Sequence, residues 1–136
     1  MKDKNLNMLN SQIKSKMKIK TSVTFDAAHY LPNYKGACKF IHGHTFKVDC
    51  EIEGKINKET GMVIDFVILK NILQQYDHDF INKPQRGQKS IEIPTAENLA
   101  LYFAEVIKEF PRVDYVTIKV WESPKSYAQK TLPEEE

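Results

Sequence analysis

Two segments in the first half of the chain alternate between apolar and polar residues, as a half-buried β-strand requires. The first runs from about residue 18 to residue 29 and keeps its apolar residues on one parity. The second runs from about residue 42 to residue 53, and its apolar side chains are Phe46, Val48, Cys50 and Ile52. Each segment therefore predicts a strand that buries one face and exposes the other.

Two later segments have the spacing of amphipathic helices. Asp65 is a good N-cap, and the helix that it begins is expected to reach about Tyr76. Its expected inner face consists of Phe66, Leu69, Leu73 and Tyr76. Thr95 caps the second helix, which ends before Pro111. The expected buried stripe of that helix is Leu99, Phe103, Val106, Ile107 and Phe110.

A third alternating segment closes the pattern, from Val113 to Glu122, with Val116, Ile118 and Val120 on one parity. Strands, then helices, then a strand indicate an α+β fold with helices on one face of a mainly antiparallel sheet. The 136 residues fit one domain. We expect this domain to span residues 17–136, after a polar, flexible extension over residues 1–16.

Composition excludes several classes of protein. A formal charge of +2 is too small to indicate nucleic acid as a partner. No apolar run approaches the ~20 residues of a membrane span, so we expect no membrane association. The two cysteines, without an export signal, indicate free thiols and a cytoplasmic location. Cys50 lies on the apolar parity of its strand and is interpreted as a core residue.

The histidines carry the clearest chemical signal. His42 and His44 share the parity of the apolar residues that follow them, and His29 shares the parity of its own strand. If the two strands pair, three imidazoles converge on one face. Three histidines without a fourth protein ligand are what an open, catalytic zinc site needs. The alternative is that these histidines are hydrogen-bonded core residues.

Other polar residues are candidates for the site, and two of these positions allow two interpretations. Cys38 lies in a loop four residues before His42, and Asp77 beside His78 is either a proton-transfer pair or a polar helix end. Glu122 prolongs a buried face. It is either a solvated residue beyond the strand or an acceptor for an amide-like or guanidine-like ligand edge. Glu97 fits the first turn of a helix, where acidic residues favour the dipole.

Six short motifs, in this order, resemble those of the 6-pyruvoyl-tetrahydropterin synthase/QueD family. They are Phe25-Asp26-Ala27-Ala28-His29, the 38–44 segment CKFIHGH, the 61–66 segment GMVIDF, Asp77-His78, the 94–98 segment PTAEN, and Trp121-Glu122-Ser123. The resemblance covers roughly residues 17–124. It implies the tunnelling fold, or T-fold: a four-stranded antiparallel sheet with two helices on one face. It also implies trimers that close a β-barrel, pairs of trimers that form a homohexamer, and active sites at subunit interfaces.

The resemblance also assigns roles to individual residues. Those that match the zinc ligands are His29, His42 and His44. Cys38 matches the catalytic thiol, and Asp77 with His78 completes the proton-transfer group.

The pterin contacts carry over in the same way. Glu122 matches the carboxylate that anchors the pterin ring, and Thr95 and Glu97 match further contacts to the pterin edge. Ala96 stands where some members of the family have a hydroxyl group.

The spacing of the thiol motif separates branches of the family. Only three residues stand between Cys38 and His42. This resembles the 6-carboxy-tetrahydropterin synthase (QueD) branch of queuosine and 7-deazaguanine biosynthesis. The expected activity is a zinc-dependent carbon–carbon lyase that converts 7,8-dihydroneopterin triphosphate to 6-carboxy-5,6,7,8-tetrahydropterin, acetaldehyde and triphosphate. The alternatives are 6-pyruvoyl-tetrahydropterin synthase, which eliminates triphosphate without cleaving the carbon–carbon bond, and a non-catalytic oligomer that binds zinc and pterins.

Overall fold

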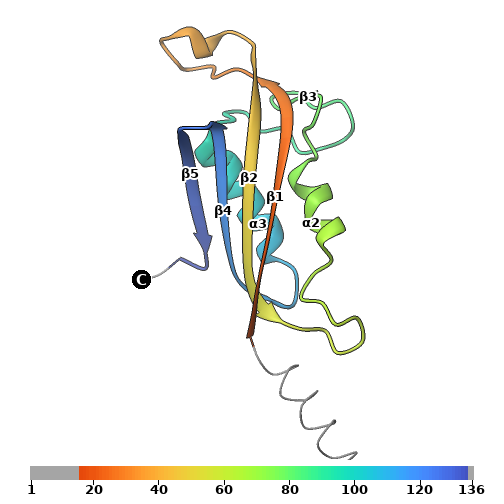
Figure 1. The fold of residues 1–136 in the computed structure, drawn as a ribbon. Helices are drawn as coiled ribbons and strands as arrows, with labels where there is room; N and C mark the ends of the chain where they lie inside the picture. The colour runs from red at the N-terminus through yellow and green to blue at the C-terminus, as the bar shows by residue number, and fades with distance from the viewer. Residues whose placement is uncertain (1–15, 135–136) are drawn as a thin grey trace, which may run out of the picture.

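The computed structural model describes residues 16–134, so the expected N-terminal extension lies outside the described residues except for Lys16. Figure 1 gives the course of the chain. The strands are β1 (Lys16–His29), β2 (His42–Lys55), β3 (Asp79–Phe80), β4 (Val113–Ser123) and β5 (Ser126–Leu132). The helices are the short 3-10 turn η1 (Ala37–Lys39), α2 (Phe66–Leu73) and α3 (Ala96–Lys108). No helix in the described range is long and apolar enough to cross a membrane.

The strands form one sheet in the order β3-β1-β2-β4-β5. The four long strands pair antiparallel, and the two-residue strand β3 adds a short parallel pairing at the outer edge of β1. The α+β expectation and the four-stranded antiparallel core of the sheet are confirmed. The apolar pattern alone missed β5, whose side chains are exposed or half-buried and do not alternate clearly. It also missed β3, which is too short to have a pattern.

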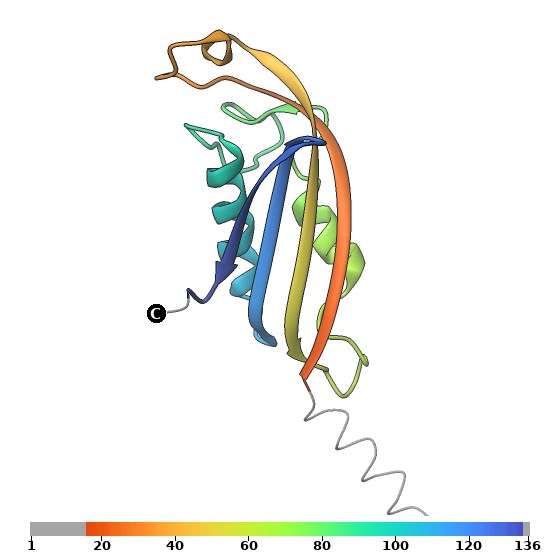
Figure 2. The same cartoon turned by 60° about the vertical axis from the view of Figure 1, so that its left-hand side comes forward.

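Both helices pack against the same face of the sheet (Figures 1 and 2). The hydrophobic core lies between the helices and the sheet. Fully buried side chains from both layers fill it, among them Phe46, Leu69, Leu73, Phe103, Ile107 and Ile118. Cys50 is also fully buried there, as expected. Burial raises the pKa of its thiol to about 12, so this cysteine is an inert packing residue.

The expected helix caps are confirmed, and two details of the helices are corrected. Asp65 accepts a hydrogen bond from the backbone of Val67, and Thr95 accepts one from the backbone of Asn98. The first helix ends at Leu73, not near Tyr76, which is buried in the turns beyond it. Phe66 was wrongly expected on the buried face and is 45% exposed, because it occupies the first position of α2 beside the cap.

A long loop connects β1 to β2 and stands out beyond the sheet (Figures 1 and 2). The backbone of Leu31 donates a 2.8 Å hydrogen bond to the carbonyl of Cys38, which closes the loop on itself. Three apolar side chains of the same loop are exposed: Tyr34, Phe40 and Ile41. The loop therefore presents Cys38 together with an apolar surface.

Gly54 provides a test of the packing between β2 and its neighbours. A methyl group there would lie 2.1 Å from the carbonyl oxygen of Arg112 and 2.8 Å from Val63 Cγ1, which no real contact allows. We expect Gly54→Ala to lower the free energy of unfolding by about 1–3 kcal/mol. Gly43→Ala, in the same strand, is the matched control, because its methyl group meets nothing closer than 3.7 Å. Urea unfolding measures both variants, and equal losses of stability would contradict the packing argument.

Candidate metal centre and active site

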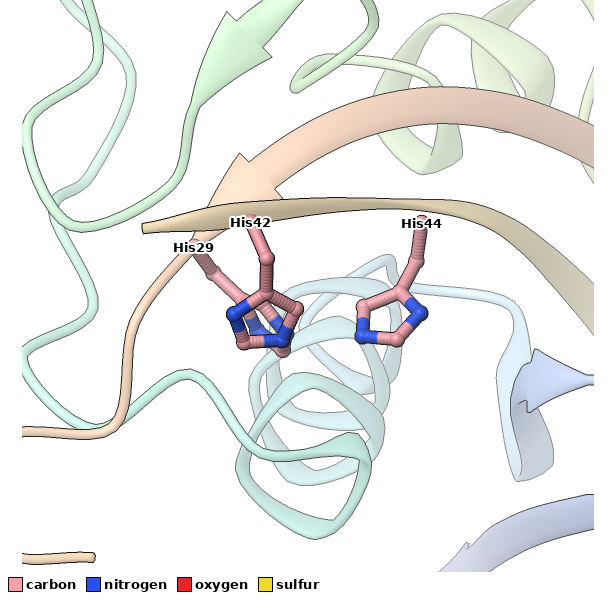
Figure 3. Close-up of side chains that lie close together, drawn as sticks. All are labelled: His29, His42 and His44. Carbon is pink, nitrogen blue, oxygen red and sulfur yellow. The ribbon is translucent and has the colours of Figure 1, made fainter. Parts of the chain in front are cut away.

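The pairing of β1 with β2 brings three histidines to one place. In the register His29 lies opposite His42, and Ala27 lies opposite His44. All three imidazoles project from the same face of the two strands (Figure 3). Their possible ligand atoms lie within 4.8 Å of one another, so the group can bind a metal ion. The expected convergence is confirmed.

Hydrogen bonds fix which ring nitrogens are free. His29 Nδ1 lies 2.8 Å from the carbonyl oxygen of Pro94, and His42 Nδ1 lies 2.7 Å from the carbonyl oxygen of Phe40. A carbonyl only accepts, so in both rings Nδ1 must be the protonated donor. Each neutral ring then has a lone pair on Nε2. Backbone carbonyls that orient histidine ligands in this way are typical of metal sites.

The two free lone pairs face each other. His29 Nε2 and His42 Nε2 are 3.1 Å apart. Two unprotonated nitrogens repel at this distance unless a cation lies between them. Two ligands about 2.0–2.1 Å from a tetrahedral zinc ion would be separated by ~3.3 Å. The donor set therefore fits a divalent metal ion, with His44 as the third ligand.

The environment of His29 favours its neutral form. Its side chain is 1% exposed, and burial is the main reason that its pKa lies below the ordinary value. The neighbouring His42 and His44 lower the pKa further, whereas the Pro94 carbonyl and the Glu122 carboxylate act in the opposite direction. A neutral imidazole is the form that binds metal.

Glu122 lies beside the cluster. It belongs to β4, so the strand does not end before it, and Glu122 Oε1 is 3.9 Å from His29 Nε2. Its side chain is about one third exposed. A carboxylate at the rim of the histidine cluster is available to a ligand that enters from solvent.

The remaining expected residues lie outside the histidine group. Cys38 is half-buried in the β1–β2 loop and is not a member of the metal-binding group. The hydroxyl of Thr95 is occupied as the N-cap of α3, next to the carbonyl of Pro94 that orients His29. Glu97 is exposed in the first turn of α3, where the helix dipole alone explains it.

Asp77 and His78 are held at the edge of β1. His78 Nδ1 lies 3.1 Å from Asp77 Oδ2. Asp77 Oδ1 accepts a hydrogen bond from the backbone of Asp26, whose carbonyl accepts one from the backbone of His78. In the part of the chain that the structure describes, no hydrogen bond or ion pair joins this pair to the histidine cluster. His78 lines a surface hollow of about 640 Å³ together with Asp26, Thr45 and His44, a member of the cluster.

The backbone of His78 is unusual. Its φ is +58°, a left-handed conformation that is uncommon outside glycine, although histidine, asparagine and aspartate adopt it more often than other side chains. Strained residues of this kind cluster at functional sites. The backbone conformation therefore indicates a functional role for His78, independently of its place beside Asp77.

Sequence reasoning missed the residues that orient the site. The carbonyls of Phe40 and Pro94 have no side-chain signature. Asn82 is a buried polar residue that bonds both backbone groups of Tyr30, directly after His29, and also the carbonyl of Glu92. Its only signal in the sequence is an amide side chain between Ile81 and Lys83.

Comparison with known proteins identifies the family of the chain. The family model described as 6-pyruvoyl tetrahydropterin synthase matches residues 18–132. A protein of Haemophilus influenzae named 6-carboxy-5,6,7,8-tetrahydropterin synthase is 32% identical, over 82% of this chain and 96% of its own length. A protein of Synechocystis with the same name is 31% identical, over 81% of this chain and 89% of its own length.

The fold is similar to those of solved structures with the same family name. The Caenorhabditis elegans 6-pyruvoyl tetrahydropterin synthase superposes with a TM-score of 0.62 at 25% identity, covering 85% of this chain and 95% of that chain. The Plasmodium vivax enzyme gives a TM-score of 0.62 at 23% identity, covering 87% of this chain and 98% of that chain. Two helices on one face of a largely antiparallel sheet thus define a T-fold protein. The chain belongs to the 6-pyruvoyl tetrahydropterin synthase family, and the expectation that it is a lyase of that family is confirmed.

Mutation of one histidine of the cluster should abolish metal binding. Purified protein should contain about one metal ion per chain, and His42→Ala should lose it, because two imidazoles make a poor site. His78→Ala is the matched control, since it removes an imidazole outside the group and should retain the metal. Elemental analysis measures both. Undiminished metal in His42→Ala would contradict the ligand set.

Proposed function

We propose that this protein converts 7,8-dihydroneopterin triphosphate to 6-carboxy-5,6,7,8-tetrahydropterin, with release of acetaldehyde and triphosphate, as a zinc enzyme of 7-deazaguanine biosynthesis. The observation that carries the proposal is the pair of facing Nε2 atoms of His29 and His42, 3.1 Å apart. Relatives that match most of the chain and are named 6-carboxy-5,6,7,8-tetrahydropterin synthase support the choice of substrate. Three imidazole ligands with a fourth position open are typical of catalytic zinc.

Each group near the centre has a part in this reaction. Zinc, when bound by His29, His42 and His44, would polarise a side-chain oxygen of the substrate. Glu122 accepts hydrogen bonds from the N–H edge of the pterin, which offsets the cost of its partial burial. The thiol of Cys38 removes a proton from the substrate side chain.

Asp77 and His78 form the second proton-transfer group. The carboxylate of Asp77 lies against His78 Nδ1 and stabilises the imidazolium that forms when His78 accepts a proton. The hydrogen bond from the backbone of Asp26 is the main reason that the pKa of Asp77 lies below its ordinary value. Asp77 is therefore a carboxylate at neutral pH. Thr95 and Glu97 complete the pterin edge of the site.

We further propose that the complete active site forms between subunits of a homohexamer. Two observations favour an assembly. Among the described residues, the outer side of β1 forms strand pairs only at Ala27 and Ala28, which leaves most of that edge open to pairing with another chain. The apolar side chains of Phe40 and Ile41, in the same loop as Cys38, are also exposed, which is typical of a surface that another subunit buries. An adjacent subunit can then supply Asp77 and His78 to the Cys38 loop.

Product analysis tests the reaction. Zinc-loaded protein with dihydroneopterin triphosphate should release acetaldehyde, measured by coupling to alcohol dehydrogenase, in equal amount to a 6-carboxy pterin identified by mass. A 6-pyruvoyl product without acetaldehyde would replace the proposal with the pyruvoyl-forming activity. Pterin binding with no turnover of either kind would favour the non-catalytic alternative.

Mixed oligomers test the shared site. Cys38→Ala and His78→Ala should each be inactive, but a mixture allowed to exchange subunits should regain about a quarter of wild-type activity, because some interfaces then receive both intact groups. Each variant taken alone through the same exchange is the control. If the mixture gains nothing although light scattering reports mixed hexamers, Cys38 and His78 do not act at one interface.

A further inference from the structure

The segment that carries Asp77 and His78 is tied to the loop of residues 83–88 by contacts that the proposed chemistry does not use. Arg86 Nη2 donates a 2.7 Å hydrogen bond to the carbonyl of Asp77 and a 3.2 Å hydrogen bond to the carbonyl of Gln75. Arg86 Nε lies 3.3 Å from Asp79 Oδ2. One guanidinium group thus holds the backbone before His78 and the carboxylate after it.

The carbonyls that Arg86 binds follow the C-terminal end of α2. Carbonyls in this position lack the partners that a continuing helix would supply. They also lie at the negative end of the helix dipole, which favours a cation. Gln88 binds the same two kinds of acceptor as Arg86. Its Nε2 donates hydrogen bonds to the carbonyl of Gln75 at 2.7 Å and to Asp79 Oδ2 at 2.8 Å.

Asp79 is the anchor of these contacts. Its side chain is 4% exposed and accepts hydrogen bonds from the backbones of Phe80 and Gln85 as well as from Gln88. Burial acts to raise the pKa of Asp79, but these hydrogen bonds and Arg86 outweigh it and lower the pKa. The anchor therefore remains a charged carboxylate that can hold the guanidinium in place.

The left-handed backbone of His78 requires support from more than one side. The strand β1 provides one side through the two hydrogen bonds between Asp26 and the Asp77–His78 segment. Arg86 provides the other side through the carbonyl of Asp77. A strained conformation persists only when its surroundings over-determine it.

We propose that Arg86 is a positioning residue, which holds Asp77 and His78 in their reactive geometry and does not bind the phosphates of the substrate. The effect of Arg86 on catalysis follows only if the proposed function is correct, and this part of the proposal rests on it. A loop arginine in a triphosphate-utilising enzyme would otherwise be a natural phosphate ligand. Its guanidinium is instead engaged with two backbone carbonyls and a buried carboxylate.

Steady-state kinetics of the full-length, metal-loaded protein distinguish the two roles. We expect Arg86→Ala to lower kcat by about 10- to 100-fold, the cost of a small misplacement of reacting groups, with KM nearly unchanged. Lys83→Ala, which removes an exposed cation from the same loop, is the matched control and should retain wild-type kinetics. A rise in KM at unchanged kcat in Arg86→Ala would overturn the proposal in favour of phosphate binding.

Chemical rescue gives a readout that general destabilisation would not. Guanidinium ion at a concentration that does not unfold the protein should restore kcat to Arg86→Ala. Arg86→Lys should remain impaired, because an ammonium group cannot present the planar fork that reaches both carbonyls and Asp79. Full activity in Arg86→Lys would contradict the positioning role.

Amide hydrogen exchange separates this proposal from the proposed function. The backbone N–H of His78, which donates to the carbonyl of Asp26 at 2.7 Å, should exchange faster in Arg86→Ala than in the wild type. If the wild type turns over no pterin, the proposed function fails, but faster exchange still supports the structural role of Arg86. Unchanged exchange at His78 in Arg86→Ala would overturn the positioning proposal whatever the activity.

Discussion

The antiparallel ladder between β1 and β2 is the constraint on which the histidine cluster depends, because it places His29 opposite His42 and Ala27 opposite His44. A shift of one residue would turn every side chain of one strand to the other face. Buried cross-strand neighbours prevent this shift, and Phe25 opposite Phe46 is the largest such pair, with ring centroids 5.2 Å apart. The register that buries the core is therefore the register that assembles the histidines.

The histidine cluster is continuous with that core. The ring of Phe46 packs edge-on against the imidazoles of His29 and His44, with ring centroids 5.5 Å and 5.6 Å apart, respectively. Burial makes protonation of His29 unfavourable, while the carbonyl of Pro94 holds its Nδ1 as a donor. The same packing that stabilises the fold thus prepares Nε2 for a cation and fixes the direction in which it points.

The second chemical group is organised by different physics. Asp77 and His78 lie beyond the end of a helix, where unpaired carbonyls and a left-handed residue must be stabilised by polar contacts instead of apolar burial. Asp26 provides these contacts from the sheet, and Arg86 provides them from the following loop. Polar contacts from two elements, and not burial in the core, thus hold this pair in place.

The sequence by itself determined the three alternating strands, both helix caps and the position of His29, His42 and His44 on the apolar faces of their strands. These features follow from local periodicity and local hydrogen bonding, which a sequence displays directly. It did not determine the edge strand β5, because an edge strand with few buried side chains has little periodicity. Only the tertiary structure decided that Pro94, 65 residues from His29, orients its ring, and that Arg86 holds Asp77. Both contacts involve backbone carbonyls, which every residue carries, so no residue type marks them in advance.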